Sequence, residues 1–107
     1  MPRKPLDEPE VVSALTRLPD WSLDRGKLHR DFRFRGFVEA FGFMTQSALV
    51  AENLGHHPEW FNAGPLVRVH LTTHDAGGVT DLDLTLAAKM DRLAASFCGQ
   101  PRVEPVA

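Results

Sequence analysis

The chain has 107 residues, of which 43% are hydrophobic and 24% charged, as expected for one globular domain. Its formal net charge of −2 and the lack of any Lys/Arg block disfavour direct nucleic-acid binding, and its one cysteine, Cys98, excludes an internal disulfide and a Cys-based zinc site. With no apolar run near the ~20 residues of a membrane span and no signal-peptide pattern, a cytoplasmic protein is expected.

The first part of the chain predicts a helix and a β-hairpin. Apolar residues at helical spacing indicate a helix at about residues 8–18. A turn at residues 24–26 then joins two expected strands, at residues 21–23 and 27–35. In the second strand, Phe32 and its apolar neighbours share one face by the two-residue period, which predicts burial of that face only.

A long helix is predicted at residues 37–54, and Gly55 is suited to end it. The helix carries two apolar stripes, one beginning at Phe37 and the other at Phe43. Because burial on one side needs only one stripe, two stripes indicate contacts with the sheet and with another subunit.

The last part of the chain predicts a second hairpin and a third helix. Strands are expected at residues 60–63 and 66–73 around a turn at residues 64–65. Thr80 and Asp83 resemble a capping box that begins the helix. The order α-β-β-α-β-β-α predicts an α+β fold, with a four-stranded antiparallel sheet and three helices packed on one face. We expect a single domain over residues 1–107, ordered at about residues 7–98 with flexible ends.

Three histidines are the candidate catalytic residues. His56 and His57 lie where the long helix ends, and Pro58 favours an extended backbone at His57, so the two rings should point in opposite directions. His74 ends the fourth expected strand, and the hairpin allows it to share a pocket with His56. Imidazoles titrate near neutral pH, so a pair of them supplies a general acid and a general base. Which ring begins protonated is left open.

Other interpretations compete with catalysis. His29 and His70, on the polar faces of two strands, are expected to be merely solvated. The three candidate histidines suggest a zinc-dependent hydrolase as an alternative, but adjacent diverging rings are poorly placed to share an ion, so no metal is expected. Glu52 can equally be a solvated helix residue, and Cys98 a passive apolar one.

Residues 52–62 carry the pattern Glu-x-x-x-His-His-Pro-Glu-Trp-Phe-Asn, followed by Leu-Thr-Thr-His-Asp-Ala-Gly-Gly at residues 71–78 and then by Asp83. In this order and spacing the chain resembles the pterin-4a-carbinolamine dehydratase family over about residues 21–94. The resemblance implies the same α+β fold. One departure is the turn at residues 64–65, Gly-Pro here, where the family commonly has an aromatic and then a polar residue.

The resemblance also implies an activity: a 4a-hydroxytetrahydropterin, left by an aromatic amino acid hydroxylase, loses water to give a quinonoid dihydropterin. His56 and His74 would be the general acid and base, and His57 would mainly hold the pterin. The implied pterin-binding residues are Glu52, Gly55, His57, Pro58, Trp60, Thr72, Thr73 and Asp75. No metal or separate cofactor is implied. A homodimer or homotetramer is implied, with a hydroxylase as a possible partner.

A non-enzymatic role is the main alternative. Relatives with this fold also act as binding partners of other proteins, which suggests a dimerising accessory or assembly factor. The three histidines argue for the enzyme, because a pure binding module has no chemical need for them.

Overall fold

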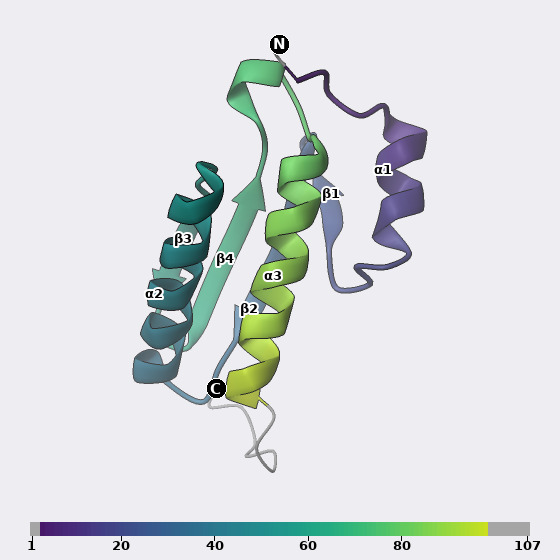
Figure 1. Cartoon of the computed structure of the whole chain (residues 1–107). Coiled ribbons are helices and arrows are strands. Elements are labelled where there is room, and N and C mark those ends of the chain that lie inside the picture. Colours follow the sequence, from purple (N-terminus) through teal and green to yellow (C-terminus); the bar gives the residue numbers. More distant parts are fainter. Residues whose placement is uncertain (1–2, 99–107) are drawn as a thin grey trace.

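Four strands form one antiparallel sheet in the computed structural model, which describes residues 3–98 (Figure 1). The elements are α1 (Glu8–Leu15), β1 (Ser22–Asp24), β2 (Lys27–Arg33), α2 (Phe37–Leu54), β3 (Glu59–Ala63), β4 (Leu66–Leu71), the 3₁₀ turn η1 (His74–Ala76) and α3 (Asp81–Cys98). This order confirms the predicted α+β fold. The expected flexible C-terminal end, residues 99–107, and the Cys98 side chain lie outside the described residues.

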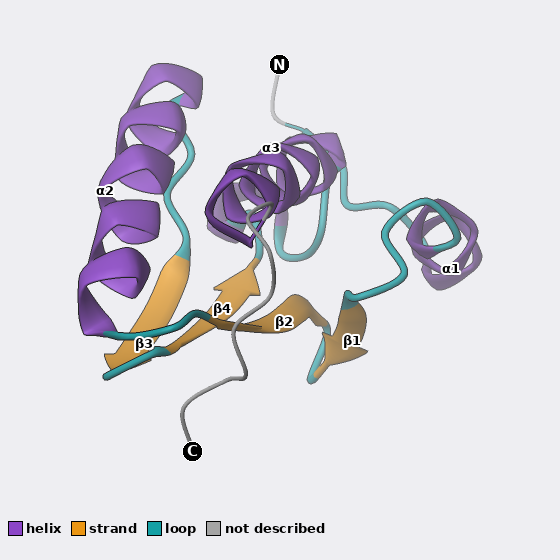
Figure 2. Cartoon of the chain, turned by 90° about the horizontal axis from the view of Figure 1, so that it is seen from below, coloured by secondary structure: helices purple, strands orange, loops and turns teal. Residues whose placement is uncertain are grey.

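The strands are arranged in the order β1-β2-β4-β3, and each neighbouring pair is antiparallel. Figure 2 shows the helices on one side of this sheet, with α1 beside β1 and the other face left open. The register pairs Leu28 with Leu71 and His29 with His70. The pairing of β2 with β4 therefore brings together residues about 40 positions apart in the chain.

The core lies between the sheet and the helices. The apolar residues on one face of β2 and β4, Leu28 and Val69 among them, are buried, as the two-residue period predicts. Phe43 from α2 packs on Phe32 with ring centroids 4.6 Å apart, and Met90 from α3 is fully buried. Each such side chain contributes about 1.5–3 kcal/mol when fully buried. This core fixes the positions of the helix and strand ends that carry the candidate site.

Helix α2 has the predicted bounds, and Gly55 ends it in the left-handed conformation at φ 65°. Phe43 and Ala51 face the core, whereas Phe37 and Phe41 are 55% and 57% exposed. Apolar residues thus cover two sides of the helix, and contact with another subunit stays a prediction. Within residues 3–98, no helix combines the length and hydropathy needed to cross a membrane.

Three predicted boundaries are wrong by two or three residues. Helix α1 ends at Leu15 because the next residues turn more tightly, with the Leu18 N–H donating to the Leu15 carbonyl. Strand β2 stops at Arg33, where its partner strand begins at Leu66. Strand β4 ends at Leu71 rather than at residue 73, because the chain bends there into η1 and Thr73 pairs with Gly78 instead.

Residues 3–6 of the N-terminal arm contact the start of α3, and the expected flexibility of this end stays a prediction. The Leu6 N–H donates to the Val79 carbonyl at 2.8 Å, and Arg3 forms a 2.7 Å ion pair with Asp81 at the start of α3. The arm therefore lies against the loop that leads into α3.

Candidate active site

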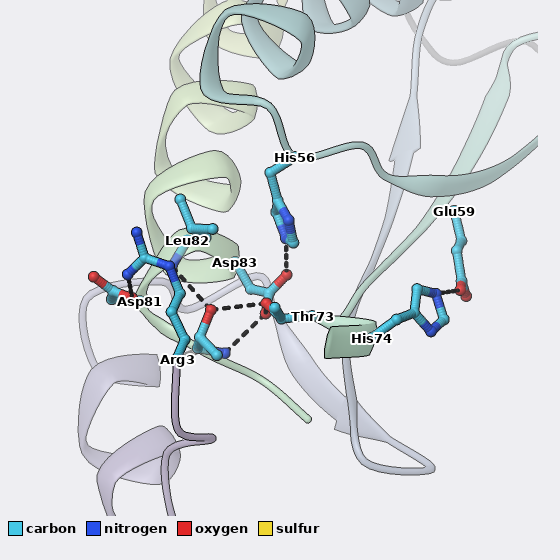
Figure 3. A network of polar contacts seen from close by, with 9 residues as sticks. Arg3, His56, Glu59, Thr73, His74, Asp81, Leu82 and Asp83 are labelled. Atoms are coloured by element: carbon cyan, nitrogen blue, oxygen red, sulfur yellow. Dashed lines mark hydrogen bonds and ion pairs between the residues drawn. The ribbon is translucent and has the colours of Figure 1, made fainter. Parts of the chain in front are cut away.

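The most buried of the candidate histidines, His56, is held by an aspartate of α3. Gly55 reverses the chain at the end of α2, and the His56 N–H donates to the Ala51 carbonyl at 3.0 Å. The His56 side chain is 9% exposed, and its Nε2 lies 2.5 Å from Asp83 Oδ1. Figure 3 shows this ring pointing down onto the Asp83 carboxylate. Two elements that are distant in sequence therefore fix the orientation of the ring.

The Asp83 carboxylate is fully buried and shared by several donors. Its Oδ2 accepts from the Thr80 N–H and from the Thr73 hydroxyl, both at 2.8 Å. Because the Thr73 hydrogen goes to Asp83, the Thr80 hydroxyl donates to Thr73 Oγ1 at 2.7 Å. Thr80 Oγ1 in turn accepts from the Leu82 N–H at 3.2 Å. Asp83 thus caps α3, as predicted from the capping pattern, and also orients His56.

His74 lies in η1 at the end of β4 and is 75% exposed. Its Nε2 is 2.9 Å from Glu59 Oε2, and Lys27 donates to the other oxygen of Glu59 at 2.7 Å. The hydrogen bond from Lys27 lowers the pKa of Glu59; burial opposes this, and the hydrogen bond from His74 lowers the pKa further. Glu59 is therefore an ionised acceptor for the His74 ring at neutral pH.

His57 is directed to solvent, unlike its neighbour His56. It is 67% exposed, and its Nε2 is 2.9 Å from Oε1 of Glu52, which lies in the last turn of α2. The two adjacent rings thus occupy different environments, as the extended backbone before Pro58 predicts. Glu52, a candidate binding residue, makes this contact from an exposed position.

All three rings present the same nitrogen to a carboxylate. In His56, His57 and His74 it is Nε2 that lies within 3 Å of Asp83, Glu52 and Glu59, respectively. A carboxylate only accepts hydrogen bonds, so each Nε2 carries a hydrogen. Nδ1 is then the nitrogen of each ring left to give or take a proton. Orientation of a catalytic imidazole by a carboxylate is a recurrent arrangement in enzymes.

His56 and His74 are linked through shared neighbours. Asp83 contacts both His56 and Thr73, and Thr73 immediately precedes His74. Glu59, three residues after His56, contacts His74 directly. In Figure 3, the His56 ring points to Asp83 and the His74 ring points to Glu59, with Thr73 between them. The structure brings the two histidines into one neighbourhood, and a single pocket shared by their rings stays a prediction.

The other predicted binding residues surround these histidines with different degrees of exposure. Gly55 and Asp75 are exposed, Pro58 and Thr72 are half-buried, and Thr73 is buried in the Asp83 network. Trp60 is half-buried against the hydrophobic core. Sequence reasoning singled out Asp83 only as a helix cap and a motif residue, and no local pattern indicated its contact with His56.

The prediction that His29 and His70 are merely solvated is wrong. Cross-strand pairing stacks their rings with centroids 4.5 Å apart, and His70 Nε2 lies 2.8 Å from Asp24 Oδ2. Both side chains are about three-quarters buried. Among residues 3–98, Asp24, His29 and His70 are also the one group of three with metal-ligand spacing, whereas the three candidate catalytic histidines form no such group.

Comparison with known proteins identifies the family of the chain. The family model described as "Pterin 4 alpha carbinolamine dehydratase" matches residues 4–93, which is most of the chain. The chain belongs to this family. It is 54% identical over 90 residues to a Solibacter usitatus protein named "Putative pterin-4-alpha-carbinolamine dehydratase", covering 84% of this chain and 95% of that one.

Further members of the family are similarly related. A Chelativorans protein of the same name is 52% identical over 97 residues, covering 89% of this chain and 99% of the relative. Among solved structures, a Brucella melitensis protein described as "transcriptional coactivator/pterin dehydratase" superposes with a TM-score of 0.82 at 48% identity. That match covers 85% of this chain and 99% of the other. The resemblance noted from the sequence is therefore confirmed at the level of family and fold.

Proposed function

We propose that this chain dehydrates a 4a-hydroxytetrahydropterin to a quinonoid dihydropterin, with histidines as general acid and base. The observation that carries the proposal is the set of three imidazoles, each with Nε2 bound to a carboxylate, at the ends of α2 and β4. Membership of the family supplies the substrate class. A pair of positioned proton transfers of this kind typically accelerates a reaction by ~10²–10⁴ for each group.

The reaction needs one proton delivered and one removed. A carbinolamine carries a hydroxyl and an amine on the same carbon. An acid protonates the hydroxyl so that the C–O bond breaks and water leaves. The amine nitrogen shares its lone pair to form C=N, and a base takes the proton from that nitrogen. His56 and His74 perform these two steps through Nδ1, and exchange of protons with water then restores both rings.

The remaining residues position the substrate. His57 is exposed beside His56 and holds the pterin, together with Gly55, Pro58 and Glu52 at the end of α2 and with residues 72–75 after β4. Trp60 also binds the pterin in this proposal, as its place in the motif at residues 52–62 implies. In this proposal the enzyme returns the pterin used by an aromatic amino acid hydroxylase and works as a homo-oligomer, through the exposed apolar face of α2.

A turnover assay tests the proposal. A 4a-hydroxytetrahydropterin generated in solution dehydrates slowly without catalyst, and the appearance of the quinonoid product is followed by absorbance. The purified chain is expected to raise this rate in proportion to its concentration. If the rate is the same with and without protein, the proposed activity is wrong.

An accessory role is the second candidate, because α2 exposes the apolar side chains of Phe37, Val38 and Leu49. A large exposed apolar patch on a protein surface often marks a contact with another protein. The name of the Brucella melitensis relative also includes a coactivator role. Stable co-purification with a larger protein, together with the absence of dehydration, would favour this role over the enzyme.

A further inference from the structure

A second cluster of polar side chains lies on the open face of the sheet, outside the histidine site. Asp24 ends β1, His29 lies in β2 and His70 lies in β4. His29 and His70 are directly opposite each other, and Asp24 reaches His70 across β2. One potential ligand atom from each residue lies within 4.8 Å of the other two. Three separate strands therefore direct two imidazoles and a carboxylate to one point.

His29 is oriented as metal-binding imidazoles usually are. Its Nδ1 lies 3.1 Å from the Val69 carbonyl oxygen, which only accepts, so Nδ1 carries a hydrogen. In the neutral ring Nε2 then has a free lone pair, and it lies 3.4 Å from the Asp31 carboxylate. A backbone carbonyl that fixes the tautomer of an imidazole is the usual outer support of a metal ligand.

Asp24 supplies the negative charge of the cluster. The hydrogen bond from His70 lowers the pKa of Asp24; burial opposes this, and the charge of Arg25 lowers it further. The other cations at this face have carboxylate partners of their own, since Arg68 pairs with Asp31 and Lys27 pairs with Glu59. Asp24 therefore faces the two imidazoles together with the charge of Arg25.

The three ligand atoms, each within 4.8 Å of the other two, have to come closer together to hold an ion. A tetrahedral ion with bonds of ~2.0–2.2 Å spaces its ligand atoms about 3.4 Å apart. The two rings are stacked at an interplanar angle of 25°, so binding an ion requires both rings to rotate about χ2, and His70 Nε2 has to release the hydrogen that it donates to Asp24. A cleft of about 490 Å³ opens in front of the cluster and has room for water as a further ligand.

We propose that Asp24, His29 and His70 form a binding site for Zn²⁺, with water in the remaining position. Two imidazoles and one carboxylate match the ligand preference of zinc. Mg²⁺ and Ca²⁺ prefer shells made of oxygen and fit this set poorly. The competing arrangement is a protonated His pair held by Asp24 and Asp31 as simple ion pairs, without a metal.

Calorimetric titration of the chelator-treated, full-length protein with Zn²⁺ tests the site. The parent is expected to bind one equivalent. His29→Gln and His70→Gln are each expected to weaken binding by at least about tenfold, since even outer-shell changes act on that scale. His57→Gln is the matched control and should bind like the parent. Circular dichroism of each variant checks that it is folded.

The proposal is overturned if the parent binds no Zn²⁺, or if both His29→Gln and His70→Gln bind as tightly as the parent. Loss of binding in His57→Gln would place the ion at the other histidines and would also overturn it. A measurement on the unaltered protein is available as well. In ¹⁵N spectra of the histidine side chains, Zn²⁺ should shift His29 and His70, and shifts confined to the other histidines contradict the site.

Discussion

His56 Nε2 lies 2.5 Å from Asp83 Oδ1, and the same carboxylate accepts the Thr80 N–H that begins α3. One buried side chain therefore supports a helix end and a candidate catalytic ring. Any change at Asp83 acts on stability and on the orientation of His56 together. Separating these two effects requires variants that remove individual contacts of the carboxylate.

Replacing the buried carboxylate should destabilise the fold. Asp83→Ala leaves the His56 Nε2–H, the Thr80 N–H and the Thr73 hydroxyl without their acceptor, which is expected to cost about 3 kcal/mol or more in the free energy of unfolding. Urea denaturation measures this. Asp81→Ala removes an exposed carboxylate from the same helix turn and should cost less than about 1 kcal/mol. Equal losses of unfolding free energy in the two variants would show that the negative charge at the start of α3, and not the buried hydrogen-bond network, is responsible for the stabilisation.

The Thr73 hydroxyl links the Thr80 hydroxyl to the Asp83 carboxylate. Thr73→Val keeps the side-chain shape but removes the donor to Asp83 and the acceptor for Thr80, and should cost about 1–2 kcal/mol in unfolding free energy. Thr72→Val, at the less buried neighbouring position, is the control and should change it by less than about 0.5 kcal/mol. If Thr73→Val leaves the free energy of unfolding unchanged, the chain of hydroxyl groups does not support Asp83.

Local patterns predicted most of the elements. The bounds of α2 follow from its apolar spacing and from Gly55, whose positive φ stops the helix. Burial of Leu28, Val69 and Leu71 follows from strand alternation alone. The end of α1 was missed because a tightened last turn keeps Leu18 buried without continuing the α-helix.

Contacts between distant strands were not predictable in the same way. The stacking of His29 on His70 depends on the register between β2 and β4, and alternation says which face a residue takes but not which residue lies opposite. The link between Asp83 and His56 likewise depends on how α3 meets the end of α2. The capping pattern predicted the contact of Asp83 with Thr80, whereas the contact of Asp83 with His56 follows only from the fold.

Acid should weaken the contact between Glu59 and its two donors. The pKa of Glu59 is lowered in the folded protein, so its contribution to stability is present above the ordinary glutamate pKa and is lost as the pH falls through the lowered value. Urea denaturation between about pH 5 and pH 3 should therefore show a steeper loss in the parent than in Glu59→Gln. Glu8→Gln, an exposed change of the same charge, should follow the parent. Parallel curves for the parent and Glu59→Gln would contradict this.

The exposed aromatic pair on α2 should control self-association. Phe37 and Phe41 lie one helical turn apart with ring centroids 5.8 Å apart, and both are more than half exposed. Phe41→Glu is expected to shift the protein towards the monomer in sedimentation experiments, because a charge cannot be buried there without a partner. Val12→Glu on α1, at a similarly exposed position, should leave the assembly unchanged. An unaltered assembly in Phe41→Glu would exclude this face of α2 as the interface.

The most direct measurement of the central claim is the dehydration rate of His56→Ala and His74→Ala beside the parent. Each variant is expected to lose about 10² or more in turnover while its circular dichroism stays that of the parent. Arg33→Gln, an exposed change on β2, should keep the parental rate. Parental turnover in both histidine variants would contradict the assignment of proton transfer to these two rings.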